Sequence, residues 1–285
     1  MTRDTPQAPY TVRERQRLGT LYFLDYLFAP QRSVFIDTEV DMTAVVAHRT
    51  AARASLRRYS YVSYVLHGAG RALARYPEAN AAPVGRLRPR VVRFRTVSAK
   101  LALDKTLDGR RLVLSAILPE VHRSSLDTIQ GQVDEYRDSD PDTLPAFAGV
   151  RRLASLPVAL GRLSFRALLA RTAARPKVLG TFSVSSLGHG PVDTMFGPGG
   201  TAVTFGVGRV RKVPVVRDGA VAIAPVMRLS MAFDHRVIDG AMAAEILGYL
   251  KESLEGFDGD SPEIQPVVQS GAGADRVVPL LVHRP

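Results

Sequence analysis

The chain has 285 residues, of which 46% are apolar and 23% charged, which is ordinary for a globular protein with a sizeable core. It contains no cysteine, and this excludes disulfide bonds, thiolate-bound zinc, iron–sulfur clusters and a cysteine nucleophile. The formal net charge of +11 favours anionic partners, among them phosphorylated cosubstrates, nucleic acid, acidic proteins and anionic lipid.

The first part of the chain predicts one strand followed by two helices. Residues 33–40 are rich in β-branched and aromatic side chains and indicate a strand. Asp41 can accept a free first-turn amide and therefore predicts the start of a helix over roughly 42–58. A second helix is expected over 61–75, ending before Pro77.

The rest of the chain predicts further strands and helices in a mixed order. In sequence these are strand-like runs within 84–120, a helix from Ser124 or Ser125 to about Tyr136, one or two helices over 146–174 interrupted near Pro157, strands at about 178–185, 202–215 and 221–233, and a helix over 241–254. This order predicts an α+β or two-layer α/β domain with a mainly mixed sheet, and it leaves the strand order open.

The pattern divides the chain into three parts. Residues 1–30 are expected to form an N-terminal arm, and 31–257 a single catalytic domain. Residues 258–285 carry Pro, Gly, Ser and Asp and predict a flexible tail.

One polar segment carries the chemistry. Residues 234–240 read Asp-His-Arg-Val-Ile-Asp-Gly, after a strand pattern and before a strong helix pattern. His235 is thus expected at the end of a strand, where its side chain can face a cleft and exchange a proton with an attacking hydroxyl or thiol. Asp239 and Arg236 can pair and fix the loop. The alternative is an Asp239 that only caps the next helix, beside a histidine with a structural role.

The same segment resembles the His-x-x-x-Asp-Gly motif of chloramphenicol-acetyltransferase-like enzymes. It looks most like the catalytic domain of dihydrolipoamide acyltransferases, the acyltransferase components of 2-oxo acid dehydrogenase complexes. Residues 180–188, which read Gly-Thr-Phe-Ser-Val-Ser-Ser-Leu-Gly, resemble that family's second signature. Residues 206–210 resemble the strand between the two, and the resemblance spans roughly residues 30–257.

The resemblance implies a mechanism. His235 corresponds to the general base, and Ser185 to the hydroxyl that donates to the oxyanion of the tetrahedral intermediate. Ser183 and Ser186 compete for that second role. Asp239 matches a residue whose part is mainly structural. The acyl group passes directly from the thioester to the acceptor, so the resemblance implies acyl-CoA as cosubstrate and no tightly bound cofactor.

The resemblance also implies an architecture. The family has a mixed sheet with flanking helices, the chloramphenicol-acetyltransferase-like fold. It assembles as trimers with the active site between subunits. We therefore expect a homotrimer or a multiple of three, with His235 and Ser185 contributed by different chains.

The sequence departs from the family on the acceptor side. About 30 residues precede the first landmark, too few for the lipoyl and subunit-binding domains of complex-forming members. Residues 108–113 lack the usual Gly-Leu-x-x-Pro-Val string, and 138–176 look longer than the family's connection. These departures favour a small-molecule alcohol as acceptor, as in natural-product (tetronate-type) biosynthesis. The alternatives are a lipoyl domain on a separate protein and, in another class, a non-catalytic trimeric scaffold. The acyl group and the acceptor's identity stay open.

Other features favour no further site. The arginines at 86, 88, 90, 93 and 95 are interpreted as a solvated strand face, and no pattern typical of nucleic-acid binding accompanies them. The histidines at 48, 67, 122 and 283 lack metal-ligand spacing. The helix at 151–171 is suited either to a membrane surface or to covering the core. No apolar run reaches the ~20 residues of a membrane span and no signal peptide is evident, so we expect a cytoplasmic protein.

Overall fold

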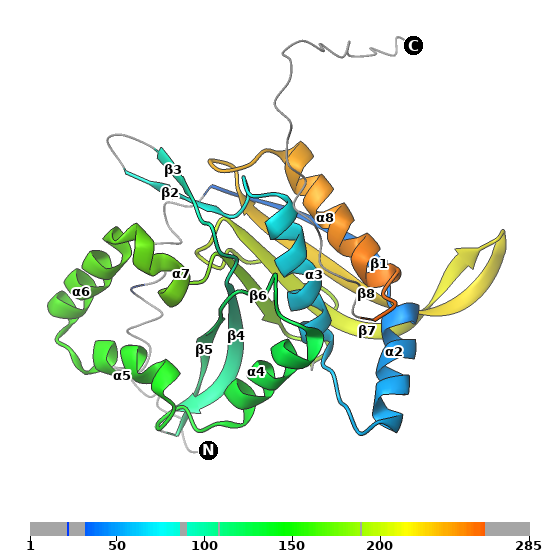
Figure 1. Cartoon of the computed structure of the whole chain (residues 1–285), viewed down its shortest axis with the longest axis horizontal. Helices are drawn as coiled ribbons and strands as arrows, with labels where there is room; N and C mark the ends of the chain where they lie inside the picture. Colours follow the sequence, from blue (N-terminus) through cyan, green and yellow to red (C-terminus); the bar gives the residue numbers. More distant parts are fainter. Residues whose placement is uncertain (1–21, 23–31, 86–89, 108, 189, 260–285) are drawn as a thin grey trace, which may run out of the picture.

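The computed structural model describes residues 22, 32–85, 90–107, 109–188 and 190–259 (Figure 1). A six-stranded sheet runs through the molecule in the order β1-β8-β7-β6-β4-β5, and β2 and β3 pair separately. Its strands are β1 Ser33–Asp41, β4 Ala99–Leu107, β5 Arg110–Leu118, β6 Phe182–Ser186, β7 Val203–Arg217 and β8 Ala220–Asp234. The two-stranded sheet is β2 Ala81–Val84 with β3 Arg90–Arg93. The helices are α2 Thr43–Ala54, α3 Tyr61–Arg75, α4 Leu126–Asp138, α5 Ala148–Ser155, α6 Val158–Ala170, α7 Arg175–Val178 and α8 Gly240–Glu255. Two short 3-10 turns are η3 Pro145–Phe147 and η4 Thr172–Ala174.

The large sheet is mixed, as the order of the predicted elements indicates. Strand β6 is parallel to both neighbours, β4 and β7, whereas the pairs β1–β8, β7–β8 and β4–β5 are antiparallel. The expected mixed sheet with flanking helices is therefore the architecture observed.

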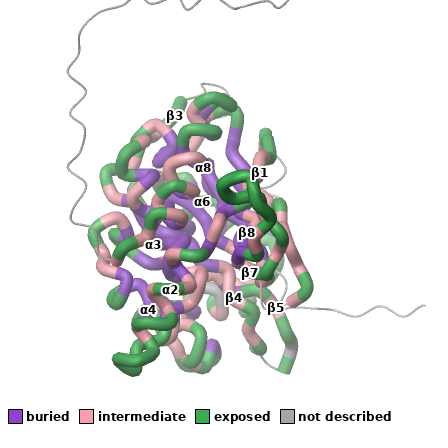
Figure 2. Tube along the Cα trace, turned by 90° about the vertical axis from the view of Figure 1, so that its right-hand side faces the viewer, coloured by how far each residue is buried: buried purple, intermediate pink, exposed green. Residues whose placement is uncertain are grey.

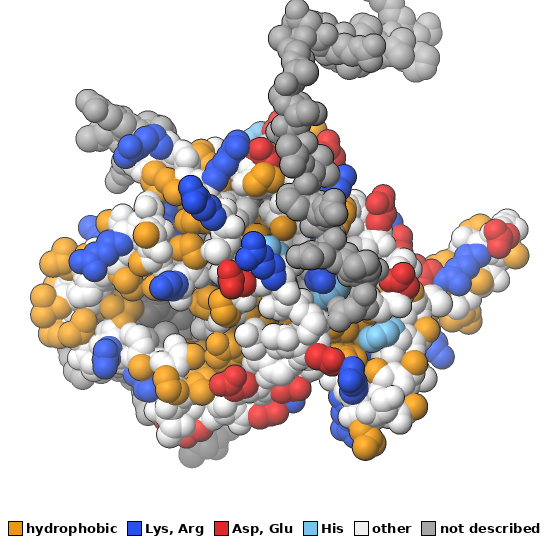
Figure 3. Space-filling view, in the orientation of Figure 1, with side chains coloured by type: hydrophobic (Ala, Val, Ile, Leu, Met, Phe, Trp, Pro, Cys, Tyr) orange, Lys and Arg blue, Asp and Glu red, His pale blue; other side chains and the backbone are white. Residues whose placement is uncertain are grey.

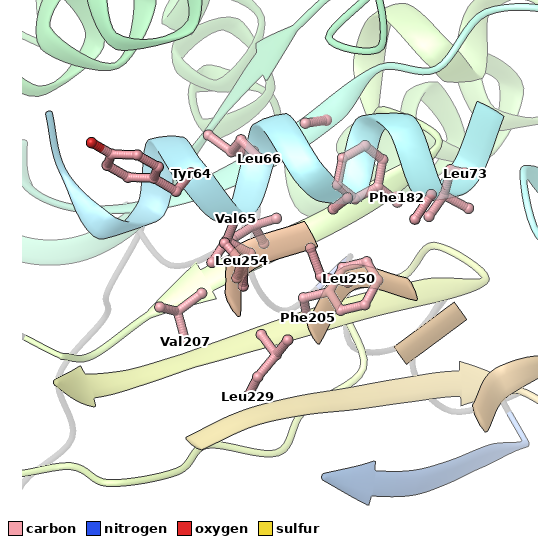
Figure 4. Close-up of a cluster of buried hydrophobic side chains, with 14 of the residues drawn as sticks. Tyr64, Val65, Leu66, Leu73, Phe182, Phe205, Val207, Leu229, Leu250 and Leu254 are labelled. Carbon is pink, nitrogen blue, oxygen red and sulfur yellow. The ribbon is translucent and has the colours of Figure 1, made fainter. Parts of the chain in front are cut away.

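The main core lies between the sheet and the helices that cover one of its faces. Helix α3 contributes Val65 and Leu73, and α8 contributes Leu250, to contacts above Phe205 and Leu229 of the sheet (Figure 4). Figure 2 shows the buried stretches running through the middle of these elements. Burying such side chains stabilises the fold by about 1.5–3 kcal/mol each, which holds the sheet rigidly against its helices.

Helices α5 to α7 form a separate lobe beside β4 and β5 (Figure 1). Phe165 and Leu169 of α6 pack with Tyr22 in a small second cluster, whereas Leu160 and Leu163 are exposed. Apolar and basic side chains are interspersed along this edge of the surface (Figure 3). One face of α6 therefore covers a small core. This agrees with the interpretation of the segment 151–171 as a core-covering helix.

The β7–β8 hairpin extends beyond the helices as an arm (Figure 1). Its turn is Asp218-Gly219, and both residues have positive φ, as a tight hairpin turn requires. Near the tip Val216, Val221 and Ile223 are each at least 74% exposed.

Most element predictions are confirmed, and two boundaries were wrong. The helix after Asp41 ends at Ala54 instead of residue 58, because Leu56 adopts a left-handed φ of 59°. The strand expected from 178 begins only at Phe182. Residues 175–178 are helical, and Gly180 turns the chain with a φ of 66°.

Three sequence predictions fall wholly or partly outside the described residues. These are most of the N-terminal arm, the tail from residue 260, and the extended face containing Arg86 and Arg88. The limits of the three parts remain predictions. None of the helices in the described part of the chain combines the length and apolarity needed to cross a membrane.

Candidate active site

His235 follows the last residue of β8 and lies on an exposed turn before α8. Its backbone N–H donates to the carbonyl of Arg32 at 2.9 Å, which ties the turn to the residue preceding β1. Its ring lies 5.7 Å from that of Phe233, centroid to centroid, and Phe233 is buried in the main core. The imidazole is thus accessible while the backbone that carries it is fixed.

An ion pair within the turn strengthens this position. The guanidinium of Arg236 donates to Asp234 from Nε at 2.9 Å and from Nη2 at 2.6 Å. The Asp234 side chain is only 3% exposed, and it also accepts the backbone N–H of Arg236 at 3.1 Å. Hydrogen bonding to Asp234 raises the pKa of Arg236. The carboxylate partner of Arg236 is therefore Asp234, where the sequence had suggested Asp239.

Asp239 caps helix α8. Its Oδ1 accepts the backbone N–H of Met242 at 3.1 Å, and its backbone is extended. Ile238, just before it, is buried in the core. Asp239 thus has the geometry of the capping interpretation, and it fixes the exit of the turn that carries His235.

Ser185 lies on the face of the sheet turned away from helices α3 and α8. Successive side chains of a strand alternate between faces. Phe182 and Val184 of β6 lie in the core beneath the helices, so Ser183 and Ser185 point to the opposite face. A loop of residues 190–201, here the cover loop, contacts that face.

The three candidate serines differ in their partners. Ser183 Oγ lies 2.8 Å from the hydroxyl of Thr201 and is buried. Ser186 Oγ accepts the N–H of Gly188 at 3.3 Å and donates to a backbone carbonyl. Ser185 Oγ contacts only a soft partner among the hydrogen bonds described, Met195 Sδ at 3.8 Å, and is half-buried. Of the three, Ser185 has the hydroxyl best placed to donate to an incoming oxyanion.

His235 and Ser185 lie far apart within one chain. Ser185 pairs in register with Gly206, and Gly206 with Ser230 on β8. His235 follows Ser230 by five residues. At about 3.3 Å per residue along a strand and about 4.8 Å between strands, the two Cα atoms are roughly 19 Å apart. A single chain does not bring these two side chains together.

Comparison with known proteins finds the same resemblance in the region that carries the candidate residues. Residues 152–259 match the family described as 2-oxoacid dehydrogenases acyltransferase (catalytic domain), and this range contains both Ser185 and His235. The resemblance to the 2-oxoacid dehydrogenase acyltransferases is thereby confirmed. A dihydrolipoyllysine-residue acetyltransferase component of the pyruvate dehydrogenase complex from Bacillus subtilis is 48% identical over 50 residues, which are 18% of this chain and 11% of that protein. The chain thus matches about a tenth of that relative's length.

Solved structures support the same fold. A probable dihydrolipoamide acetyltransferase from Listeria monocytogenes superposes with a TM-score of 0.66 at 19% identity, covering 91% of this chain and 99% of that one. The dihydrolipoamide acetyltransferase of Azotobacter vinelandii gives 0.61 at 21% identity, covering 88% and 92%. A chloramphenicol acetyltransferase gives 0.51 at 16% identity, covering 85% and 96%.

A buried lysine, Lys100, lies near Ser185, and the acyltransferase motifs in the sequence gave no indication of it. Lys100 of β4 pairs in register with Ser183, and its ammonium donates to the carbonyl of Gly199 in the cover loop. Burial lowers the pKa of Lys100 to about 8. The strand pattern of β4 alternates normally, but sequence alone does not indicate which loop covers the polar side of the sheet.

In the described part of the chain, no group of three or more His, Asp or Glu side chains is arranged to hold a metal ion. The two candidate residues are a histidine, which suits proton transfer, and a serine hydroxyl, which suits oxyanion stabilisation.

Proposed function

We propose that the protein is an acyltransferase that moves an acyl group from a coenzyme A thioester directly to an acceptor hydroxyl. The observation that carries this proposal is the accessible His235, held on a turn that is fixed at both ends, within a sequence range that matches the acyltransferase catalytic domain. A base is useful in catalysis only when its geometry is set in advance, and this turn provides that geometry.

The proposed reaction uses one base and one hydrogen-bond donor. His235 takes the proton from the acceptor hydroxyl as its oxygen attacks the thioester carbonyl. The resulting oxyanion accepts a hydrogen bond from Ser185 Oγ. The intermediate then collapses, the carbon–sulfur bond breaks, and the coenzyme A sulfur recovers the proton from the imidazolium. The products are the ester and free coenzyme A, and His235 returns to its neutral form.

The separation of the two residues supports a site shared between copies of the chain. A base and an oxyanion donor must both lie within about 3 Å of the reacting atoms. Residues roughly 19 Å apart in one chain cannot meet that condition together. A cyclic assembly repeats one heterologous contact, so His235 of one copy can face Ser185 of the next at every interface. A trimer, or a multiple of three, is the assembly proposed.

The acceptor is proposed to be a small-molecule alcohol, as in tetronate-type biosynthesis. The matched family range begins at residue 152, and the strands β4 and β5 lie outside it. The segment 108–113, which departs from the family string, covers the connection after β4 and the first residues of β5. The family match thus covers the reacting residues but does not reach this segment, on which the acceptor prediction rests.

A thiol acceptor is the second candidate. The curated relatives are named dihydrolipoyllysine-residue acetyltransferases, which favours a lipoyl group on a separate protein. A thiol is more acidic than an alcohol, so it depends less on the base. His235 serves either acceptor.

One assay separates these candidates. The full chain is incubated with acetyl-CoA and, in parallel, with dihydrolipoamide, a lipoylated domain or a panel of hydroxymethyl-bearing small molecules. Thiol release and product mass are followed. Acylation of an alcohol at a higher kcat/KM than dihydrolipoamide supports the leading proposal. The reverse order favours the lipoyl acceptor. Transfer that is equally fast with His235→Ala removes His235 as the base, and no transfer to any acceptor favours a scaffold.

A further inference from the structure

We propose that Met195 sets the size of the acyl group that the site accepts. The inference rests on the proposed function, because it assumes that Ser185 binds the carbonyl oxygen of the thioester. The Met195 side chain would form the wall beside that oxygen and restrict the donor to short acyl chains such as acetyl.

The backbone of Met195 is held directly on the polar side of the sheet. Ser230 on β8 donates its hydroxyl to the Met195 carbonyl. Gly206 on β7 makes this approach possible, since a Cβ at that position would collide with the same carbonyl oxygen. Met195 therefore lies against the centre of the sheet.

The cover loop is fixed on both sides of Met195. Before it, the Asp193 carboxylate pairs with Arg209 Nε at 2.6 Å, and hydrogen bonding to Arg209 lowers the pKa of Asp193. After it, the N–H of Gly199 donates to Thr204 Oγ1 at 2.7 Å, and Lys100 donates to the Gly199 carbonyl. With the loop tied at both sides, the backbone of Met195 cannot withdraw easily to admit a larger group.

The Met195 side chain reaches the proposed oxyanion position. Its Sδ lies 3.8 Å from Ser185 Oγ, and both residues are half-buried. An oxyanion bound to Ser185 lies about 2.7–3.1 Å from Oγ, and the acyl carbon is one bond beyond it. The first carbons of the acyl chain would thus come within contact distance of the thioether.

The neighbours of Ser185 on the adjacent strands are small. Ala102 on β4 and Gly206 on β7 are its partners in register, and both have small side chains or none. Met195 is the large side chain at this point, so its volume decides how many methylene groups fit. A pocket that gains or loses about one methylene changes discrimination by about 10–200-fold.

The test compares acyl-CoA donors of increasing length. Acetyl-, butyryl- and hexanoyl-CoA are assayed with wild type, Met195→Ala and the volume-conserving Met195→Leu. Phe196→Ala is the matched control, because the neighbouring ring packs edge-on against Phe35 at 6.0 Å. We expect Met195→Ala to raise the kcat/KM ratio of butyryl- over acetyl-CoA by at least about tenfold, while Met195→Leu and Phe196→Ala keep the wild-type ratio.

A binding measurement keeps this inference separate from the proposed function. Calorimetry with S-ethyl- and S-hexyl-CoA thioethers, which cannot react, gives the chain-length preference without turnover. Tighter relative binding of the hexyl compound by Met195→Ala supports the inference even if no transfer is detected. If Met195→Ala leaves the chain-length preference unchanged in both measurements, the proposed role of Met195 is wrong. If Ser185→Ala nevertheless loses activity, the proposed function still stands.

Discussion

The two faces of the central sheet differ sharply in composition. The face beneath α3 and α8 carries Phe182, Val184 and Phe205 and excludes water. The opposite face carries Ser183 and Ser185 on the same strand and is covered by a loop instead of a helix. One strand, β6, thus serves two purposes through the alternation of its side chains.

This difference explains how the fold presents a reactive group on a rigid support. Apolar burial on one face fixes the strand positions. Small and polar residues on the other face, such as Gly206, allow the cover loop to approach closely. The same rigidity extends to the end of β8, where the buried Phe233 precedes the exposed His235.

The largest effect is expected from His235→Ala, which removes the proposed base. His235 lies on the turn after β8 and belongs to neither face of the sheet. Transfer should fall by about 100–10,000-fold while the circular dichroism spectrum and unfolding midpoint stay near wild type, because the side chain is exposed. His235→Gln, which keeps a polar side chain without a basic nitrogen, should be equally inactive. A fully active His235→Gln protein would contradict the assignment.

The next largest effect on activity is expected on the face of the sheet that carries Ser183 and Ser185. Ser185→Ala should lower kcat by about 100–1,000-fold with little change in stability, because it removes one oxyanion donor. Ser183→Ala is the matched control on the same strand, and its hydroxyl is already engaged by Thr201. If Ser183→Ala loses more activity than Ser185→Ala while remaining folded, the assignment of the donor is wrong.

A pH-dependent effect on stability tests the burial of Lys100. Its pKa is about 8 in the folded protein and 10.5 ordinarily, so the unfolded chain keeps the proton to higher pH. The cost of burying the charge is therefore fully present below about pH 8 and is relieved between about pH 8 and 10.5. The free energy of unfolding of wild type, relative to Lys100→Met, should rise by up to roughly 3 kcal/mol over that window.

Urea unfolding of both proteins at pH 7.5 and 10 provides the measurement. Taking the difference between the two proteins cancels the tyrosines that titrate at high pH. A difference that does not change with pH would show that Lys100 is not desolvated as the fold implies.

The smallest effect is expected at Asp239, the N-cap of helix α8, which packs on the apolar face of the sheet. Asp239→Ala should lower the free energy of unfolding by about 1 kcal/mol through loss of the cap on α8. Asp239→Asn retains a capping oxygen, so both its stability and its activity should stay near wild type. Loss of activity in a stable Asp239→Asn protein would instead indicate that the carboxylate itself takes part in the reaction.

The sequence predicted the parts that depend on local patterns. Helix 61–75, the helix capped by Ser125 and the position of His235 at a strand end all follow from periodicity and capping residues. The mixed fold class was predicted as well. The assignment of Arg236 to Asp239 failed because residues two apart across a turn can pair as readily as residues three apart.

Features that depend on long-range contacts could not be predicted in this way. The contact of Met195 with Ser185 requires the cover loop to fold back onto the sheet, and the burial of Lys100 depends on the same event. The distance between His235 and Ser185 likewise depends on strand order, which periodicity left open.

The most direct measurement is the mixing of two inactive variants. His235→Ala and Ser185→Ala chains, each with a different affinity tag, are coexpressed in equal amounts, and assemblies with both tags are purified. Because each site would take its histidine from one copy and its serine from the next, every trimer that contains both variants keeps one intact site, so the purified mixed trimers should regain about a third of the wild-type activity. Mixed assemblies as inactive as either parent would contradict a site shared between copies.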